Sequence, residues 1–265
     1  MSLVGIVILS VIVGIITAGL SIRFDRFFVM LLLLFVAGAT IKDAVNIFLV
    51  VIFLGAVMIL IEHKQDLKKM PAENRGKFLI VVPLLTAFFS FLGTWAFINA
   101  SSAILIATFG TLTVFYGLRM TVIHFSDEEK NHVHGTALMQ KFCGLAGPMI
   151  SGFFVGFIGT SLKSLKIPFA VKFGKMNLGQ VYIGNAITAA YASLFAILWR
   201  FALVGTDQMA FMLYGVVIWG LAHAISDMTV PLFPERWKKG FQILIGIALL
   251  VAAIRVFSLL GASVM

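Results

Sequence analysis

Charged side chains are scarce in this sequence. They make up 12% of its 265 residues, whereas hydrophobic residues make up 61%. The mean hydropathy of +1.07 lies outside the range of soluble globular domains. A chain with so few charges and so many long apolar runs places most of its surface in lipid. The composition therefore predicts an all-α polytopic membrane protein.

Cysteine is nearly absent as well. Cys143 is the only one, so the chain has no internal disulfide and no cluster of thiolate metal ligands. The sequence also lacks the HExxH, GxSxG and GxxxxGK patterns and the glycine fingerprint of dinucleotide-binding proteins. We therefore expect no enzyme activity and no cofactor.

Basic residues exceed acidic ones, with 20 Lys and Arg against 11 Asp and Glu. They are scattered among short loops rather than gathered in one arm, so they do not indicate nucleic-acid binding. None precedes Arg23, so the first apolar run lacks the basic region of a signal peptide. We expect that run to remain as a membrane segment, with the lipid bilayer around it.

Eight apolar runs are each close to the roughly 20 residues that span a bilayer. They cover residues 3–22, 43–61, 78–98, 103–123, 142–160, 180–204, 208–230 and 241–260. Two shorter runs, Phe27 to Ile41 and Ile167 to Met176, each follow the first long run of one half of the chain. The first of them would reach only about 22 Å as a helix, against a hydrocarbon core of about 30 Å.

The two halves of the chain resemble each other weakly. Gly14 to Ser21 aligns with Gly152 to Gly159, and Asn46 aligns with Asn185 a little later. We predict a first membrane repeat over residues 1–125, a polar connecting loop over 126–141 and a second repeat over 142–265. Paired short or interrupted segments in two repeats are typical of the binding site of a secondary transporter.

The distribution of basic residues predicts how often the chain crosses the membrane. If the two short runs cross, fifteen basic residues face one side and five face the other, whereas re-entrant short runs give ten on each side. Only the uneven distribution satisfies the positive-inside rule. We therefore predict ten crossings with both termini outside, which makes the two repeats of about five segments inverted relative to each other.

The stretch from Gly152 to Pro168 combines a glycine stripe with a helix break. Gly152, Gly156 and Gly159 share one face of a helix, where another backbone can come close. Hydroxyl groups, two lysines and a proline follow, and the proline disfavours helix inside an otherwise apolar region. A helix that ends at membrane depth is tolerated only where its polar backbone lines a cavity or meets protein. We therefore expect a substrate site here.

The candidate substrate-binding residues are Gly159, Thr160, Ser161, Lys163, Lys166, Asn185, Asn46 and Arg23. Lys163 and Lys166, with the backbone N–H groups freed at the break, can form a cationic pocket for a small anion. The alternative is that both lysines extend to interfacial water from a helix end. Asn46 and Asn185 can each donate to an anion or hold two helices together. Arg23 either faces the substrate or forms a structural ion pair with Asp25.

Two further groups of residues are candidates for proton or metal chemistry. His223 and Asp227 share one helix face at spacing i, i+4, which suits a proton relay or an interfacial ion pair. The loop from His124 to His134 resembles a metal-binding cluster in composition, but its spacing does not match a compact zinc or calcium site. We expect a solvated loop there and no metal site.

The spacing of Gly152, Gly156, Gly159, Lys166 and Pro168 resembles the TauE/SafE family of sulfite and organosulfonate exporters. That family carries a glycine-rich signature in each half, of the form G-xxx-G-xx-G-x-GGG-xxxx-P. A lysine often stands two residues before the proline.

The arrangement of apolar segments resembles that of the family over nearly the whole chain. Fewer of the individual motif residues match. Ser161, Leu162 and Lys163 stand where the family has three consecutive glycines, and Gly14 is the glycine kept in the first-half copy. The segment Ile183 to Thr188 and the basic stretch before the last apolar run also fit. The resemblance implies an integral inner-membrane permease for small anions, commonly sulfur-containing ones.

From these features we expect a secondary transporter that exports a small anion, of the sulfite or sulfoacetate type, by alternating access through a cationic site at paired helix breaks. The expected location is the cell inner membrane, with many crossings, and the chain is also compatible with a homodimer. Two alternatives stay open. One is a divalent metal-cation carrier that uses His124, His132 and His134, and the other is a membrane enzyme or a non-catalytic membrane subunit.

Overall fold

The computed structural model describes residues 3–20, 28–65, 80–122, 137–163, 166, 167, 170, 178–205 and 209–262. Within these ranges the chain forms helices, turns and short connections, without any β-strand. The predicted all-α fold is therefore confirmed.

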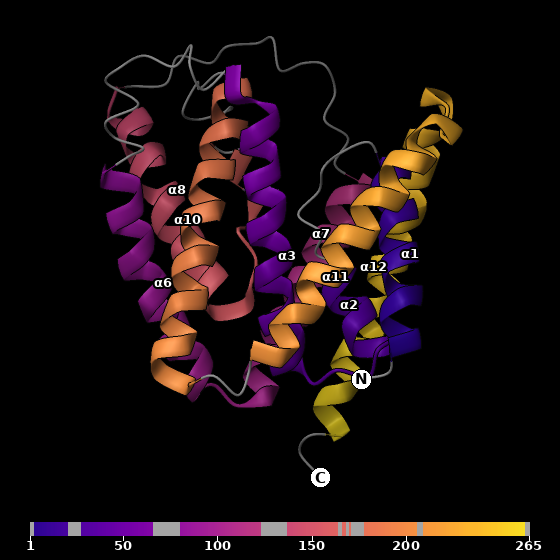
Figure 1. Cartoon of the computed structure of the whole chain (residues 1–265), viewed down its shortest axis with the longest axis horizontal. Helices are drawn as coiled ribbons and strands as arrows, with labels where there is room; N and C mark the ends of the chain where they lie inside the picture. Colours follow the sequence, from indigo (N-terminus) through magenta and orange to yellow (C-terminus); the bar gives the residue numbers. More distant parts are fainter. Residues whose placement is uncertain are drawn as a thin grey trace. The chain divides into compact units, whose positions relative to one another are not determined.

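Eight long helices correspond to the eight long apolar runs. They are α1 (Leu3–Leu20), α3 (Ile41–Glu62), α6 (Val82–Asn99), α7 (Ser102–Val122), α8 (Ala137–Ile158), α10 (Leu178–Val204), α11 (Met209–Thr229) and α12 (Glu235–Ala262), and Figure 1 shows them along the chain. A 3-10 turn, η4 (Val230–Leu232), follows α11. Helix α8 begins earlier than predicted, at Ala137, inside the stretch that the sequence assigned to the connecting loop.

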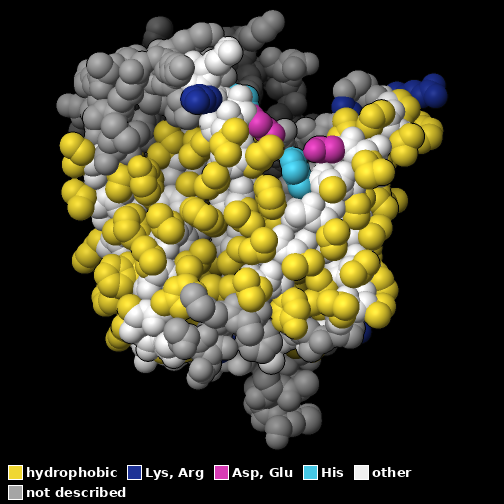
Figure 2. Space-filling view, viewed as in Figure 1, with side chains coloured by type: hydrophobic (Ala, Val, Ile, Leu, Met, Phe, Trp, Pro, Cys, Tyr) yellow, Lys and Arg dark blue, Asp and Glu magenta, His cyan; other side chains and the backbone are white. Residues whose placement is uncertain are grey.

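Seven of the described helices are long and apolar enough to cross a membrane, and α8 contributes a shorter apolar segment, Leu145–Ile158. Large apolar side chains on these helices are exposed, such as Trp95 at 58%, Leu213 at 65% and Ile254 at 73%. Figure 2 shows that apolar side chains cover most of the described surface on the face in view. Such a surface is stable only in lipid or against another apolar surface, so the chain is a multi-pass membrane protein.

The first of the two short runs forms helix α2 (Phe28–Phe35), which has 8 residues. Helix α2 ends because Gly38 takes up a left-handed conformation with a φ of 66°, and the Ala39 N–H donates to the Leu33 carbonyl at 2.9 Å. Eight helical residues reach about 12 Å, well short of a hydrocarbon core of about 30 Å. The predicted short helix is present, but this run does not cross the membrane as a single helix.

Helix α3 begins directly after that turn with a capped end. The Asp43 N–H donates to Thr40 Oγ1 at 3.2 Å, and the Thr40 hydroxyl donates to Asp43 Oδ2 at 2.7 Å. This reciprocal arrangement satisfies a backbone donor that the first turn of a helix leaves without a partner. Thr40 thus caps the start of α3.

The chain forms two compact units. Unit 1 contains Met1–Phe48, Asn99–Phe125 and Ala210–Met265, and unit 2 contains Leu49–Ile98 and Ser126–Met209. Each unit combines segments from both halves of the sequence. The predicted repeats over residues 1–125 and 142–265 stay a prediction.

Within unit 1, α7 and α12 approach closely at a pair of glycines. A Cβ placed on Gly246 would lie 3.1 Å from the Gly117 carbonyl oxygen and 2.7 Å from Thr121 Cγ2. One turn further along, Leu250 packs over Gly117, and Phe257 packs over Gly110. Small residues therefore allow these two helices to come close, and apolar side chains fill the space beside them.

Within unit 2, the centre of the packing is a small apolar cluster. Leu49 of α3, Val155 of α8 and Ala192 and Ala196 of α10 are all fully buried there. The two alanines on one face of α10 let α8 come close to it, and this contact fixes the position of the end of α8.

Candidate functional site

Helix α8 ends as predicted, directly before Gly159. Gly159 has a φ of 75°, and its N–H donates to the Val155 carbonyl at 3.0 Å. Thr160 and Ser161 follow without regular helix, both buried, and Leu162 then has a φ of 49°. A leucine in the left-handed region is a strained residue, because its Cβ crowds the following carbonyl. The break is therefore a specific backbone structure rather than a frayed helix end.

The predicted glycine stripe packs α8 against α6. A Cβ placed on Gly156 would lie 2.4 Å from the Ser90 carbonyl oxygen, and one on Gly152 would lie 3.0 Å from the Thr86 carbonyl oxygen. The approach is reciprocal, because a Cβ on Gly93 of α6 would lie 2.1 Å from the Phe153 carbonyl oxygen. The two backbones thus touch, which no side chain larger than hydrogen would allow.

A buried network joins Lys166 to the last turns of α8. The Lys166 Nζ donates to Ser151 Oγ, and the Ser151 hydroxyl donates to the Ser161 carbonyl at 3.3 Å. Ser151 is 0% exposed and Ser161 is 1% exposed. The turn itself is closed by the Lys166 N–H, which donates to the Leu162 carbonyl at 3.0 Å. An ammonium group is therefore held against buried hydroxyl and carbonyl groups at the break.

The second predicted lysine, Lys163, contacts an aromatic side chain. Its Nζ lies 4.0 Å from the centre of the Tyr182 ring, near the start of α10. His63, just beyond the end of α3, meets the same ring edge-on at 6.0 Å between ring centres. A cation over an aromatic face is attracted by the electrons of the ring, typically by about 0.5–1 kcal/mol at an exposed site. Tyr182 thus holds Lys163 beside the break.

The two predicted asparagines lie in different units. Asn185 is on α10 in unit 2, three residues after Tyr182 and so on the same side of the helix. Its amide oxygen is buried and has no hydrogen-bond partner among the described residues. Asn46 is fully buried on α3 in unit 1. Asn185 therefore belongs to the same unit as the break, and a role for Asn46 in substrate binding stays a prediction.

Two predicted residues, Arg23 and Pro168, lie outside the described residues. Gly159, Thr160, Ser161, Lys163 and Lys166 are brought together by one short turn of chain. Ser151 and Tyr182 complete the site but were not predicted. Their signals in the sequence were weak, because a serine or a tyrosine inside an apolar run is common in membrane helices.

Arg200 is the most buried charged side chain that the sequence reading did not select. It is 2% exposed, its Nη2 donates to the Gly156 carbonyl at 2.9 Å, and its guanidinium carbon lies 3.7 Å from the centre of the Phe97 ring. Gly156 belongs to the last turn of α8, where carbonyl groups lack helical partners and carry partial negative charge. Arg200 therefore caps the broken end of α8. Arg200 could have been selected from the sequence, because it is an arginine inside the apolar run of residues 180–204.

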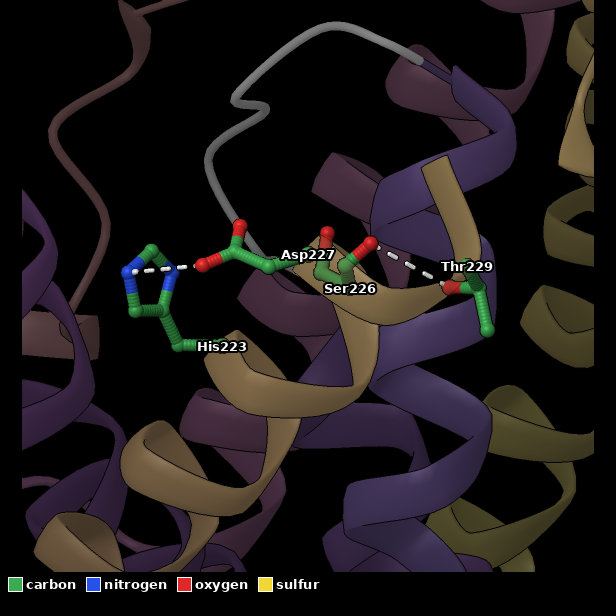
Figure 3. Close-up of polar contacts among 4 residues, drawn as sticks. All are labelled: His223, Ser226, Asp227 and Thr229. Carbon is green, nitrogen blue, oxygen red and sulfur yellow. Dashed lines mark hydrogen bonds and ion pairs between the residues drawn. The ribbon is translucent and has the colours of Figure 1, made fainter. Parts of the chain in front are cut away.

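The predicted relay pair lies on α11 in unit 1 (Figure 3). His223 Nε2 and Asp227 Oδ2 are 3.6 Å apart, and the two side chains are 24% and 66% exposed. The distance exceeds that of a hydrogen bond, so the pair is an ion pair when His223 is protonated. The Trp219 ring stacks on His223 at 5.3 Å, and Thr229 Oγ1 donates to the Ser226 carbonyl at 3.3 Å. The proton relay stays a prediction.

A metal site is not formed by the part of the chain that the structure describes, since no group of three or more His, Cys, Asp or Glu comes together within it. The loop from His124 to His134 lies outside that part.

No family model matches this chain, and no curated protein or solved structure matches it either. The resemblance to the TauE/SafE exporters therefore rests on the sequence patterns described above and stays a prediction.

Proposed function

We propose that this protein is a secondary transporter that exports a small anion, with a sulfur oxyanion or organosulfonate as the expected substrate. The observation that carries this proposal is the break after Ile158, where the Lys166 ammonium group meets the buried Ser151 hydroxyl. Lys163 lies one turn away and gives a second positive charge. An oxyanion can be bound by two ammonium groups together with hydroxyl and amide donors.

The charge of the surrounding helices favours an anion over a cation. Helices α6, α8 and α10 contain no Asp or Glu in their sequences, whereas the break and the end of α10 carry Lys163, Lys166 and Arg200. A lysine at the centre of a bilayer costs about 2.5–3.5 kcal/mol unless it is solvated or paired. A bound anion would offset that cost, which explains why such residues would be kept at a substrate site.

The membrane potential favours outward movement of an anion. A cytoplasm-negative potential contributes about 2.3 kcal/mol per charge per 100 mV. An anion that moves outward therefore runs downhill without a coupling ion. Alternating access would come from movement of one repeat against the other around the paired breaks, which are predicted after the first long segment of each half.

The experiment that tests the proposal is direct binding to the purified full-length chain in lipid nanodiscs. Sulfite, sulfoacetate, thiosulfate, lactate and a divalent metal are titrated separately into the wild type and into Lys166→Ala. We expect sulfur anions to bind the wild type, and Lys166→Ala to weaken that binding tenfold or more, equal to about 1.4 kcal/mol. The matched control is Lys64→Ala, because Lys64 is an exposed lysine at the end of α3 in the same unit.

The outcomes separate the alternatives. Equal anion affinity in the wild type and in Lys166→Ala would show that the break is not the binding site. Binding of the metal alone would replace the proposal with the cation carrier. Binding of none of these probes would favour the membrane subunit, and a co-purifying partner would then be the observation to seek.

A further inference from the structure

Two hydroxyl groups on α6 are buried without a hydrogen-bond partner. Ser90 and Thr94 are both 0% exposed, and neither side-chain oxygen has a partner among the described residues. They are four residues apart, so they lie on one face of α6, together with Phe97 three residues further on. This face is the one that packs against α8.

Five other buried hydroxyls in the described helices behave differently. Each of these five donates to the carbonyl four residues earlier in its own helix, as is usual for a lone hydroxyl in a membrane helix. These are Ser10, Thr86, Thr113, Thr188 and Ser193, at distances of 2.6 to 2.8 Å. The hydroxyls of Ser90 and Thr94 do not use this bond. A buried hydroxyl without a partner costs stability, and an anion that accepts a hydrogen bond from it would offset that cost.

Gly156 contacts both the backbone of α6 between Ser90 and Thr94 and a buried cation. A Cβ placed on Gly156 would lie 2.4 Å from the Ser90 carbonyl oxygen and 2.9 Å from the Thr94 backbone nitrogen. The carbonyl of the same glycine accepts the bond from Arg200 at 2.9 Å. On the other side, the Arg200 guanidinium lies over Phe97, on the same face of α6 as Thr94. The four side chains concerned all belong to unit 2, and they are those of Ser90, Thr94, Phe97 and Arg200.

We propose that Arg200, Thr94 and Ser90 form a second anion subsite, in which a small oxyanion is bound by the guanidinium and by the two hydroxyls. A planar guanidinium matches the oxygens of an oxyanion geometrically, and hydroxyl donors strengthen such binding. This inference rests on the proposed anion transport and adds a second position to it.

The two proposed anion subsites both lie along α8. Lys166 contacts α8 at Ser151, and Arg200 contacts it at Gly156. Five helical residues correspond to about 7.5 Å along the axis. An anion that leaves the lysines at the break would meet the guanidinium within one to two turns of α8. Arg200 and both hydroxyls are almost completely buried, so the second subsite is closed to solvent in this conformation.

The test uses sulfite as the probe and the purified full-length chain in nanodiscs. Thr94→Val and Ser90→Ala each remove one hydroxyl with little change in size. The matched control is Thr86→Val, on the same helix and equally buried, because the Thr86 hydroxyl already donates to the Val82 carbonyl at 2.8 Å. Arg200→Lys keeps the positive charge but loses the planar donor group.

We expect Thr94→Val and Ser90→Ala to weaken sulfite binding about fivefold to tenfold, because a hydroxyl that donates to an anion is lost. Thr86→Val should change it less than twofold, because the Thr86 hydroxyl already donates within its own helix. Arg200→Lys should weaken it more than either hydroxyl variant. Because Arg200 also caps α8, that variant can fail to fold, and the hydroxyl variants then decide the outcome.

Unchanged sulfite affinity in both Thr94→Val and Ser90→Ala would overturn the second subsite. If Lys166→Ala still loses sulfite binding in the same experiment, the proposed function stands without it. If the wild type binds no sulfur anion at all, the proposed function is wrong and the second subsite with it. The two failures are therefore distinguished by the wild type and by Lys166→Ala.

Discussion

Each of the two units contains a pair of helices that approach closely at glycines on both helices, and the two pairs differ in what surrounds the glycines. In unit 1, α7 and α12 meet at Gly117 and Gly246, where Leu250 packs over Gly117 and the Thr121 side chain lies against Gly246. The nearby Thr121 hydroxyl donates to the Gly117 carbonyl of its own helix at 3.0 Å. In unit 2, Arg200 donates to Gly156 at the contact of α6 with α8. The buried hydroxyls of Ser90 and Thr94 on α6 have no hydrogen-bond partner among the described residues.

Glycine contacts between helices therefore have different surroundings in the two units. Close approach of two membrane helices needs small residues, and both pairs have them. Only the pair in unit 2 places polar groups at the contact that packing does not require. Glycine spacing by itself therefore indicates close packing, whereas unsatisfied hydroxyls and a buried cation indicate a site.

The largest expected effect is that of filling the glycine contact in unit 2. Gly93→Ala should destabilise the protein by about 3 kcal/mol, because its Cβ meets the Phe153 carbonyl oxygen of the backbone, which cannot move aside. Gly246→Ala should cost less, since the nearest atom there belongs to the Thr121 side chain. The measurement is thermal unfolding in detergent. Gly220→Ala is the control, because no atom lies within 4 Å of its added Cβ.

Equal losses in Gly93→Ala and Gly246→Ala would show that the two contacts are equally rigid and would contradict the expected difference between the units. A loss in Gly220→Ala of the same size would show that alanine itself, rather than the contact, is responsible.

A smaller effect is expected from removal of the cap on α8. Arg200→Leu leaves the Gly156 carbonyl without its donor and should destabilise the protein by about 2 kcal/mol. Arg255→Leu in unit 1 should change stability by less than about 0.5 kcal/mol, because Arg255 is exposed and lies 4.9 Å from the Phe35 ring. Thermal unfolding of both variants at matched lipid content compares them. A harmless Arg200→Leu would mean that other donors cap the end of α8.

The smallest expected effect differs in sign between the units. Thr113→Val in unit 1 should destabilise the protein by about 0.6 kcal/mol, because its hydroxyl donates to the Phe109 carbonyl at 2.8 Å. Thr94→Val in unit 2, measured without any anion, should leave stability equal or raise it by up to about 1 kcal/mol, because it removes a buried hydroxyl that has no partner. Chemical or thermal unfolding of the two variants side by side gives the sign. A loss in Thr94→Val as large as in Thr113→Val would show that this hydroxyl is already satisfied.

Local patterns in the sequence predicted the helices and the break. The eight long apolar runs gave the eight long helices, and Gly38 and Gly159 ended α2 and α8 by taking up left-handed conformations. These features depend on residues next to one another in the chain, so composition and periodicity are sufficient to find them.

The completed site depends on residues far apart in the chain, which explains why it was only partly predicted. Ser151 meets Lys166 from fifteen residues away, and Gly156 meets Arg200 from 44 residues away. Nothing in the local pattern around Ser151 or Arg200 shows which helix each will face. The crossing number, the inverted repeat and the orientation of the termini depend on the bilayer and stay predictions from basic-residue counts.

The backbone of Leu162 has a consequence for how the protein divides its time between conformations. A leucine with a φ of 49° is about 1 kcal/mol less stable than one in an ordinary region. The strain contributes about that amount in favour of any second conformation in which Leu162 relaxes, which by itself corresponds to about a fivefold shift in the ratio of the two populations. The turn that holds the lysines thus also weakens its own conformation.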